Sequence, residues 1–173
     1  MRPRILVAGV GNIFLGDDGF GPEVVRVLAS AGSEPLPAGA RLVDYGIRGM
    51  HLAYDLLGPP ETTAGGNSCP YTALVLVDAL PADGPDRGVR VLEVAADQVS
   101  GGNTDAHGMD PVAVLSTVKT MGGTLPPTYV VGVTPVDLDE GIGLSEPVQA
   151  AVQSAADAVR DLVVRLSTEE KVS

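Results

Sequence analysis

The chain has few of the residues that several kinds of site require. Its 173 residues include one cysteine, two histidines, and 11 basic residues against 22 acidic ones, which gives a formal net charge of −11. A single cysteine forms no internal disulfide, and without paired cysteines a closed structural zinc site is not expected. The acidic charge repels phosphate backbones, and the basic residues are scattered along the chain, so nucleic acid is not an expected partner.

The chain also lacks a long hydrophobic run. No apolar stretch approaches the length of a membrane span. The first residues, MRPRILVAGVGN, carry no small-residue cleavage pattern and predict a strand rather than a signal peptide. We therefore expect a cytoplasmic protein with no membrane partner, in which Cys69 is a plain loop thiol.

What the chain does have is enough apolar side chain for one sizeable core, since 45% of its residues are hydrophobic. We expect a single domain over residues 1–166 and a frayed tail over 167–173. Apolar runs predict strands at 5–8, 40–44, 72–77, 88–94 and 129–133, and apolar periodicity predicts helices from Pro22 to just before Gly32 and over 50–57, 110–121 and 145–166.

This alternation of strands and helices predicts a three-layer α/β/α domain with a mainly parallel, about five-stranded twisted sheet. The run TALVLV at 72–77 is the expected central strand, and 88–94 lies nearer an edge. The segments 58–70 and 95–109 are expected to be irregular. Ligand sites in such sheets lie at the carboxyl ends of the strands, which nominates Gly9–Asp18, Asp44 and Asp78.

The glycine-rich turn GVGNIFLGDDGFG, residues 9–21, matches neither common phosphate-binding motif. Phe14 stands where a dinucleotide fingerprint needs its third glycine, and Asp17 and Asp18 replace the lysine and hydroxyl of a P-loop. Exposed carboxylates suit a cation or proton transfer. Both aspartates could instead stabilise the amino end of the Pro22 helix through its dipole, and for Asp17 we prefer that structural role.

Further polar groups follow the other strands. Asp44 and Asp78 come at the ends of predicted strands, and each could equally hydrogen-bond its own following turn. His107 lies in a polar loop before a predicted helix, where an imidazole could point into the cleft or simply lie at the surface. His51 lies on a helix and is expected at its surface. Together, Asp18, Asp78 and His107 would form a mixed oxygen and nitrogen set that suits zinc, nickel or another borderline divalent ion.

Five segments together resemble one family, the hydrogenase maturation endopeptidases, which remove a C-terminal extension from the large subunit of nickel–iron hydrogenases. The segments are ILVAGVGNIFLGDDGFG, VDYGIRGMHLAYDLL, LVLVDAL, the His107 loop with its following helix, and VVGVTPVDLDEGIGLSEPV. The family often has Glu where this chain has Asp18. His51 and the 58–70 loop are also departures from its pattern.

The resemblance implies a phosphorylase/hydrolase-like fold and an aspartic-type or metal-dependent endopeptidase. It implies metal contacts at Asp18, Asp78 and His107, and Asp44 as another acid near the cleft. The candidate catalytic residues are then Asp18, Asp44 and Asp78. The metal is expected to be nickel already carried by the large-subunit precursor, with zinc or cadmium able to substitute in vitro. Because the sequence shows no serine or cysteine nucleophile set, water is the expected nucleophile.

Two other functions compete with this interpretation. One is a non-catalytic nickel- or nucleotide-binding module on the same α/β scaffold, because a fold alone does not determine function. The other is a peptidyl-tRNA hydrolase-like enzyme, which the acidic charge and the lack of a basic strip disfavour.

Overall fold

The computed structural model describes residues 4–58, 69–81, 88–95, 99 and 111–169. The elements in chain order are β1 (Ile5–Val10), the 3₁₀ helix η1 (Gly16–Gly19), α1 (Phe20–Leu28), β2 (Ala40–Gly46), α2 (Gly49–Leu57), β3 (Ala73–Ala79), β4 (Arg90–Val94), α3 (Pro111–Thr120), β5 (Thr128–Val133) and α4 (Glu146–Glu169).

The strands form one five-stranded sheet in the order β2-β1-β3-β5-β4. Pairs β1–β2, β1–β3 and β3–β5 are parallel, and β4 runs antiparallel to β5 at the edge. The predicted mainly parallel sheet is therefore confirmed, with β3 at its centre and β4 at an edge. In the register, Gly9 pairs with Asp44 of β2 and with Val77 of β3, so these three strands end close together.

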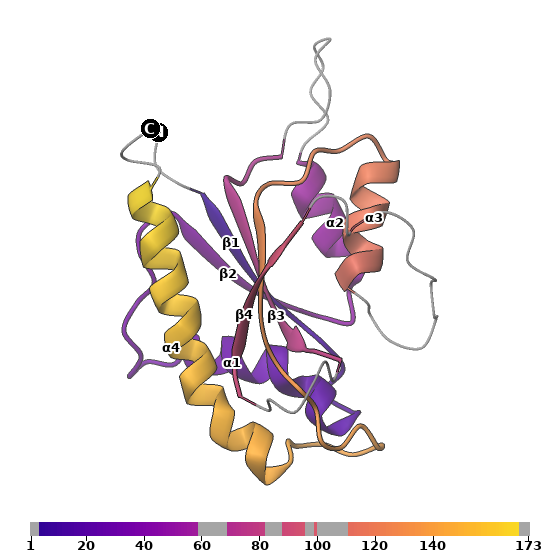
Figure 1. Ribbon diagram of the computed structural model, residues 1–173, viewed down its shortest axis with the longest axis vertical. Helices are drawn as coiled ribbons and strands as arrows, with labels where there is room; N and C mark the ends of the chain where they lie inside the picture. Colours follow the sequence, from indigo (N-terminus) through magenta and orange to yellow (C-terminus); the bar gives the residue numbers. More distant parts are fainter. Residues whose placement is uncertain (1–3, 59–68, 82–87, 96–98, 100–110, 170–173) are drawn as a thin grey trace.

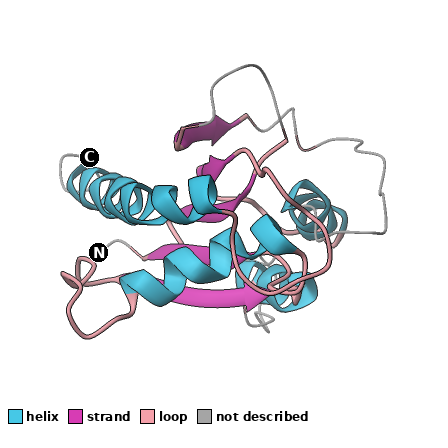
Figure 2. Ribbon diagram, turned by 90° about the horizontal axis from the view of Figure 1, so that it is seen from below, coloured by secondary structure: helices cyan, strands magenta, loops and turns pink. Residues whose placement is uncertain are grey.

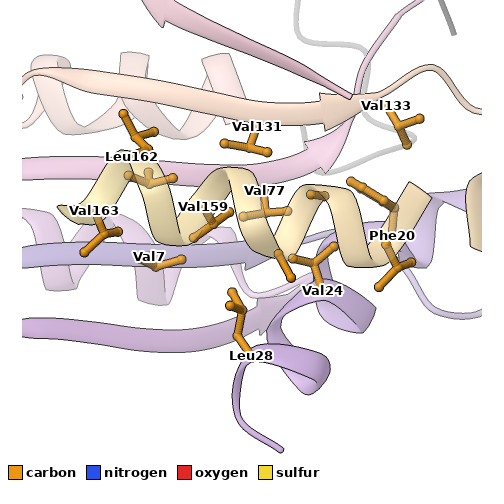
Figure 3. Close-up of a cluster of buried hydrophobic side chains, with 14 of the residues drawn as sticks. Val7, Phe20, Val24, Leu28, Val77, Val131, Val133, Val159, Leu162 and Val163 are labelled. Atoms are coloured by element: carbon orange, nitrogen blue, oxygen red, sulfur yellow. The ribbon is translucent and has the colours of Figure 1, made fainter. Parts of the chain in front are cut away.

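Helices cover both faces of the sheet. Figures 1 and 2 show α1 and α4 on one face and α2 and α3 on the other. Each face has its own apolar core, and Figure 3 shows valines of β1, β3 and β5 meeting α1 and α4. Strands β1 and β3 are buried along nearly their whole length because both of their faces are covered, which explains their continuous apolar runs.

A close backbone contact fixes the start of α1 on the sheet. A Cβ added to Gly21 would lie 2.3 Å from the carbonyl oxygens of both Val10 and Val77. Only glycine allows the first turn of α1 to rest directly on the ends of β1 and β3. The sequence after β1 is thus positioned against β3, the next strand in the sheet.

The observed bounds differ from the predicted ones at several ends. The helix predicted from Pro22 begins at Phe20, after a 3₁₀ turn that contains both aspartates. Asp78 lies within β3 rather than after it, and α4 runs to Glu169, three residues past the predicted end at 166. Asp110, the expected cap of α3, lies outside the described residues. None of the described helices is long and apolar enough to cross a membrane.

Candidate functional site

The connections from β1 and β3 leave the sheet in opposite directions, because β1 leads to β2 on one side and β3 leads to β5 and β4 on the other. In open α/β sheets such a switch point leaves a crevice at the carboxyl ends of the strands, and ligands bind there. Asp78 lies near the end of β3 and Asp18 lies in η1, on the connection that follows β1, so both residues are near the two strands that flank this point.

Asp78 is held by the central strand. Its residue is only 5% exposed, and its backbone pairs with Gly132 of β5. Its Oδ1 accepts a 2.8 Å hydrogen bond from the backbone N–H of Ala79, the next residue of the same strand, so this bond holds the carboxylate locally without closing a turn. The local role and a role at the crevice are therefore compatible for this side chain.

Asp18 is half-buried and belongs to η1. Its Oδ2 accepts a 2.7 Å hydrogen bond from the backbone N–H of Asn12, across the glycine-rich turn. The residue at the N-cap of α1 is Gly19, and no side chain makes a capping hydrogen bond there. Asp18 therefore closes the turn after β1 and does not cap the helix by hydrogen bonding.

Asp44 is exposed at the carboxyl end of β2. Its Oδ1 accepts a 2.9 Å hydrogen bond from Gly46 N–H, the turn contact considered from the sequence. Arg48 donates from Nε to the Tyr45 carbonyl at 3.1 Å and from Nη2 to the Asp44 carbonyl, which fixes the backbone of this turn. The position of Asp44 is thus set by its own β2–α2 connection.

Asp44 lines a groove of about 370 Å³. The other walls come from the turn after β1, from α1, and from the segment before α4, and they include Ile13, Glu23, Arg26, Ile142 and Leu144. Arg26 donates two hydrogen bonds, of 2.8 and 2.6 Å, to the two oxygens of Glu23, and this contact lowers the pKa of that carboxyl. The groove therefore combines apolar walls, a paired Glu23 and the exposed carboxylate of Asp44.

Asp17 has a different place from the one expected. It is fully buried, and its carboxylate accepts hydrogen bonds from the N–H groups of Val136 (2.8 Å), Asp137 (2.9 Å) and Ser145 (2.6 Å) and from the Ser145 hydroxyl (2.8 Å). Burial alone would raise the pKa of Asp17, but these bonds outweigh it and the pKa lies below its ordinary value. Asp17 therefore has a structural role, as expected, but its hydrogen bonds go to a loop far along the chain and not to α1.

The loop 134–145, between β5 and α4, is a part of the site that the sequence does not predict. Only the family resemblance draws attention to this segment. A usable signal was its alternation of exposed apolar and acidic residues, VDLDEGI at 136–142. That pattern fits neither a core strand nor an ordinary polar loop.

The remaining candidate residues from the sequence are His107, His51 and Cys69. His107 lies outside the described residues, so the set of Asp18, Asp78 and His107 stays a prediction. Within the described part of the chain, no group of three His, Cys, Asp or Glu residues could hold a metal ion. His51 is exposed on α2 as predicted. Burial raises the pKa of the Cys69 thiol, which disfavours the thiolate and agrees with its interpretation as a non-nucleophilic cysteine.

Comparison with known proteins gives a consistent result. A family model described as "Hydrogenase maturation protease" matches residues 22–162. The chain is 28% identical over 161 residues to the hydrogenase 2 maturation protease of Escherichia coli K12, covering 90% of this chain and 88% of that protein.

Solved structures agree with the sequence relatives. The hydrogenase maturating endopeptidase HybD from E. coli has a TM-score of 0.72 and 27% identity, with 94% of this chain and 93% of that chain covered. A hydrogenase 2 maturation peptidase from Thaumarchaeota archaeon SCGC_AB-539-E09 has a TM-score of 0.63 and 29% identity, with 92% and 97% covered. The five-stranded, mostly parallel sheet flanked by helices is therefore the fold of these structures.

Proposed function

Since the chain belongs to the hydrogenase maturation protease family and is a hydrolase, an endopeptidase of that family, we propose that it removes the C-terminal extension of a nickel–iron hydrogenase large-subunit precursor after nickel insertion. The family membership removes the support for a non-catalytic binding module. The observation that carries the proposal is the family match together with three aspartates at the carboxyl end of the sheet: Asp44 and Asp78 near the ends of β2 and β3, and Asp18 in η1, which follows β1.

In this proposal the nickel belongs to the substrate, and Asp18, Asp78 and His107 contact it. Two carboxylates and an imidazole supply oxygen and nitrogen donors, which suit a borderline divalent ion and leave positions for the ligands that the precursor itself provides. Recognition of the ion would restrict cleavage to precursors that already contain nickel. The burial of Asp78 and the Asn12 contact of Asp18 support this role, because both hold a carboxylate in a fixed position.

Asp44 is the group that we assign to the water nucleophile. It is an exposed carboxylate that lines the groove, whereas Asp78 is buried within β3. The water oxygen bonds to the scissile carbonyl carbon, Asp44 takes the proton from the water, and the amide C–N bond breaks. The leaving nitrogen then receives the proton, which gives a carboxyl end on the mature subunit and a free amine on the released peptide.

The test is cleavage of purified precursor with and without nickel, followed by mass measurement of the large subunit and the released peptide. We expect cleavage of the nickel-loaded form only. Asp18→Ala, Asp78→Ala and His107→Ala are each expected to abolish cleavage, and Asp44→Asn is expected to lower kcat by about 10²-fold with KM nearly unchanged.

The matched control is Asp161→Ala, because Asp161 is exposed on α4 and is not among the residues that line the groove. It should process the precursor at the wild-type rate. If wild-type protein leaves the nickel-loaded precursor intact, the proposed activity is wrong. If Asp18→Ala cleaves normally, the turn contact to Asn12 is the whole role of that residue.

A further inference from the structure

Exposed apolar side chains gather in the loops at the carboxyl end of the sheet. They come from three connections that follow β1, β2 and β5, and from the first turn of α2: Ile13, Phe14, Ile47, Met50, Val136, Leu138 and Ile142. Ile142 is 79% exposed and Phe14 is 59% exposed. Single exposed apolar residues are common, but a group around one edge of a sheet indicates a binding surface.

The loop 134–145 is joined to the β1 turn along a continuous seam. Gly16 N–H donates to the Gly141 carbonyl at 3.0 Å, Gly141 N–H donates to the Phe14 carbonyl at 2.9 Å, and Asp17 N–H donates to the Asp137 carbonyl at 2.8 Å. Figure 1 shows the orange loop before α4 beside the turn that precedes α1. The two segments therefore present their apolar side chains as one unit.

The buried carboxylate of Asp17 adds further hydrogen bonds across this seam. Its bonds reach the two ends of the loop, at Val136 and Asp137 on one side and at Ser145 on the other. A loop whose ends share one buried acceptor has little freedom to move apart from the β1 turn. Pre-organised loops bind partners with a smaller entropic cost than mobile ones do.

The charge of the loop limits what can bind it. The exposed acidic residues of the loop alternate with its exposed apolar residues: Asp137 lies between Val136 and Leu138, and Asp139 and Glu140 lie between Leu138 and Ile142. The whole chain has a net charge of −11. A complementary partner surface carries apolar side chains bordered by lysine or arginine. A second copy of this chain is disfavoured as the partner, because a symmetric contact would bring two copies of the acidic loop into one interface.

We propose that the loop 134–145, together with Ile13 and Phe14, is the surface that docks the folded body of the large-subunit precursor, with Asp17 as its positioning residue. This inference rests on the proposed function. The partner surface is apolar with a basic border, and it lies on the precursor next to the segment that enters the groove. Ile142 links the two regions, since it is both exposed at the loop tip and part of the groove wall.

The test compares steady-state KM and kcat for nickel-loaded precursor among wild type, Ile142→Ser, the double variant Asp139→Asn with Glu140→Gln, Asp17→Asn, and the control Val164→Ser. Val164 is 49% exposed on α4 and lines neither the groove nor the loop. Loss of one central apolar contact should raise KM about five- to tenfold for Ile142→Ser with kcat changed less than about twofold. The acidic double variant should show a smaller rise in KM and a weaker dependence of KM on salt.

Each outcome decides a separate question. If wild type cleaves the precursor and Ile142→Ser matches Val164→Ser in KM, the docking surface is wrong while the proposed activity stands. If wild type does not cleave, the proposed activity fails and the inference fails with it. Asp17→Asn tests whether Asp17 positions the loop: the variant should raise KM by a larger factor than it lowers kcat. A fall in kcat with KM unchanged would contradict the positioning role. Should that variant not fold, Ile142→Ser still decides the inference.

Discussion

Asp17 and Asp18 are neighbours in the chain, yet they serve two different regions of the molecule. Asp17 is fully buried in the seam between the β1 turn and the loop 134–145, where four donors surround its carboxylate. Asp18 is half-buried at the carboxyl end of β1, and its side chain accepts one described hydrogen bond, from Asn12. The Asp17 carboxylate is enclosed by protein donors, while the Asp18 carboxylate keeps acceptor capacity at the crevice.

This difference separates structural from functional carboxylates without reference to relatives. The four hydrogen bonds of Asp17 reach both of its carboxylate oxygens, and the side chain has no exposed surface, so neither oxygen is accessible to a metal ion or a substrate. Asp18 retains most of its capacity in a place where α/β proteins bind ligands. We therefore expect substitution of Asp17 to lower stability first and substitution of Asp18 to lower activity first.

The largest expected effect is on catalysis, from Asp18→Asn. The amide oxygen can still accept the hydrogen bond from Asn12 N–H, so the free energy of unfolding should change by less than about 1 kcal/mol. Cleavage of nickel-loaded precursor should fall by at least about 10²-fold, because a neutral amide stabilises a cation poorly. Urea unfolding and a cleavage assay on the same preparation measure both quantities. A variant that loses stability but keeps its activity would reverse the roles of the two aspartates.

The second-largest expected effect is a loss of stability at pH 7 in the Asp17→Asn variant. The amide NH₂ group would face N–H donors of the loop, and at least one buried hydrogen bond would be lost, at a cost of about 1–3 kcal/mol in the free energy of unfolding. Hydrogen exchange should show faster exchange at Val136, Asp137 and Ser145, with the β1 amides unchanged. Equal acceleration in β1 would mean that the carboxylate supports the whole sheet and not the seam.

The contribution of Asp17 should also depend on pH. Its pKa lies below its ordinary value in the folded protein, so the folded state binds the proton more weakly than the unfolded chain does. The stabilisation is then fully present above about pH 4, the ordinary range for aspartate, and it is lost as the pH falls through the lower folded pKa. The difference in unfolding free energy between wild type and Asp17→Asn should accordingly shrink from pH 7 to pH 3. A difference that stays constant from pH 7 to pH 3 would show that the charge of Asp17 does not contribute to the stability.

Much of the fold follows from local patterns. The runs ILVA and TALVLV predict strands covered on both faces, and β1 and β3 have those positions. The helix bounds were less accurate, because polar residues such as those at the end of α4 continue a helix without adding to its apolar stripe. The 3₁₀ turn at Gly16–Gly19 was not predicted either, since its conformation depends on contacts with the distant loop.

The site residues also divide into those that local sequence predicts and those that depend on distant contacts. Asp44 and Asp78 lie near the carboxyl ends of β2 and β3, as the strand-end rule predicts, since strand positions are readable from sequence. The partners of Asp17 are 119 to 128 residues away in the chain, and no periodicity or spacing reports such a contact. A local interpretation therefore assigned that carboxylate to the nearest helix.

The smallest expected effect concerns the backbone of the seam and comes from Gly16→Ala with Gly122→Ala as its matched control. Both glycines have positive φ, 52° and 81°, so each substitution carries a conformational cost of about 1 kcal/mol. A Cβ at Gly16 would also lie 2.6 Å from the Asp137 carbonyl oxygen, whereas a Cβ at Gly122 meets nothing within 4 Å. Gly16→Ala should therefore cost about 1 kcal/mol more unfolding free energy than Gly122→Ala, and it alone should accelerate amide exchange at Asp17 and Gly141. Equal costs and equal exchange would mean that the loop adjusts freely at this point, and that the carboxylate of Asp17 and not the close backbone contact holds the two segments together.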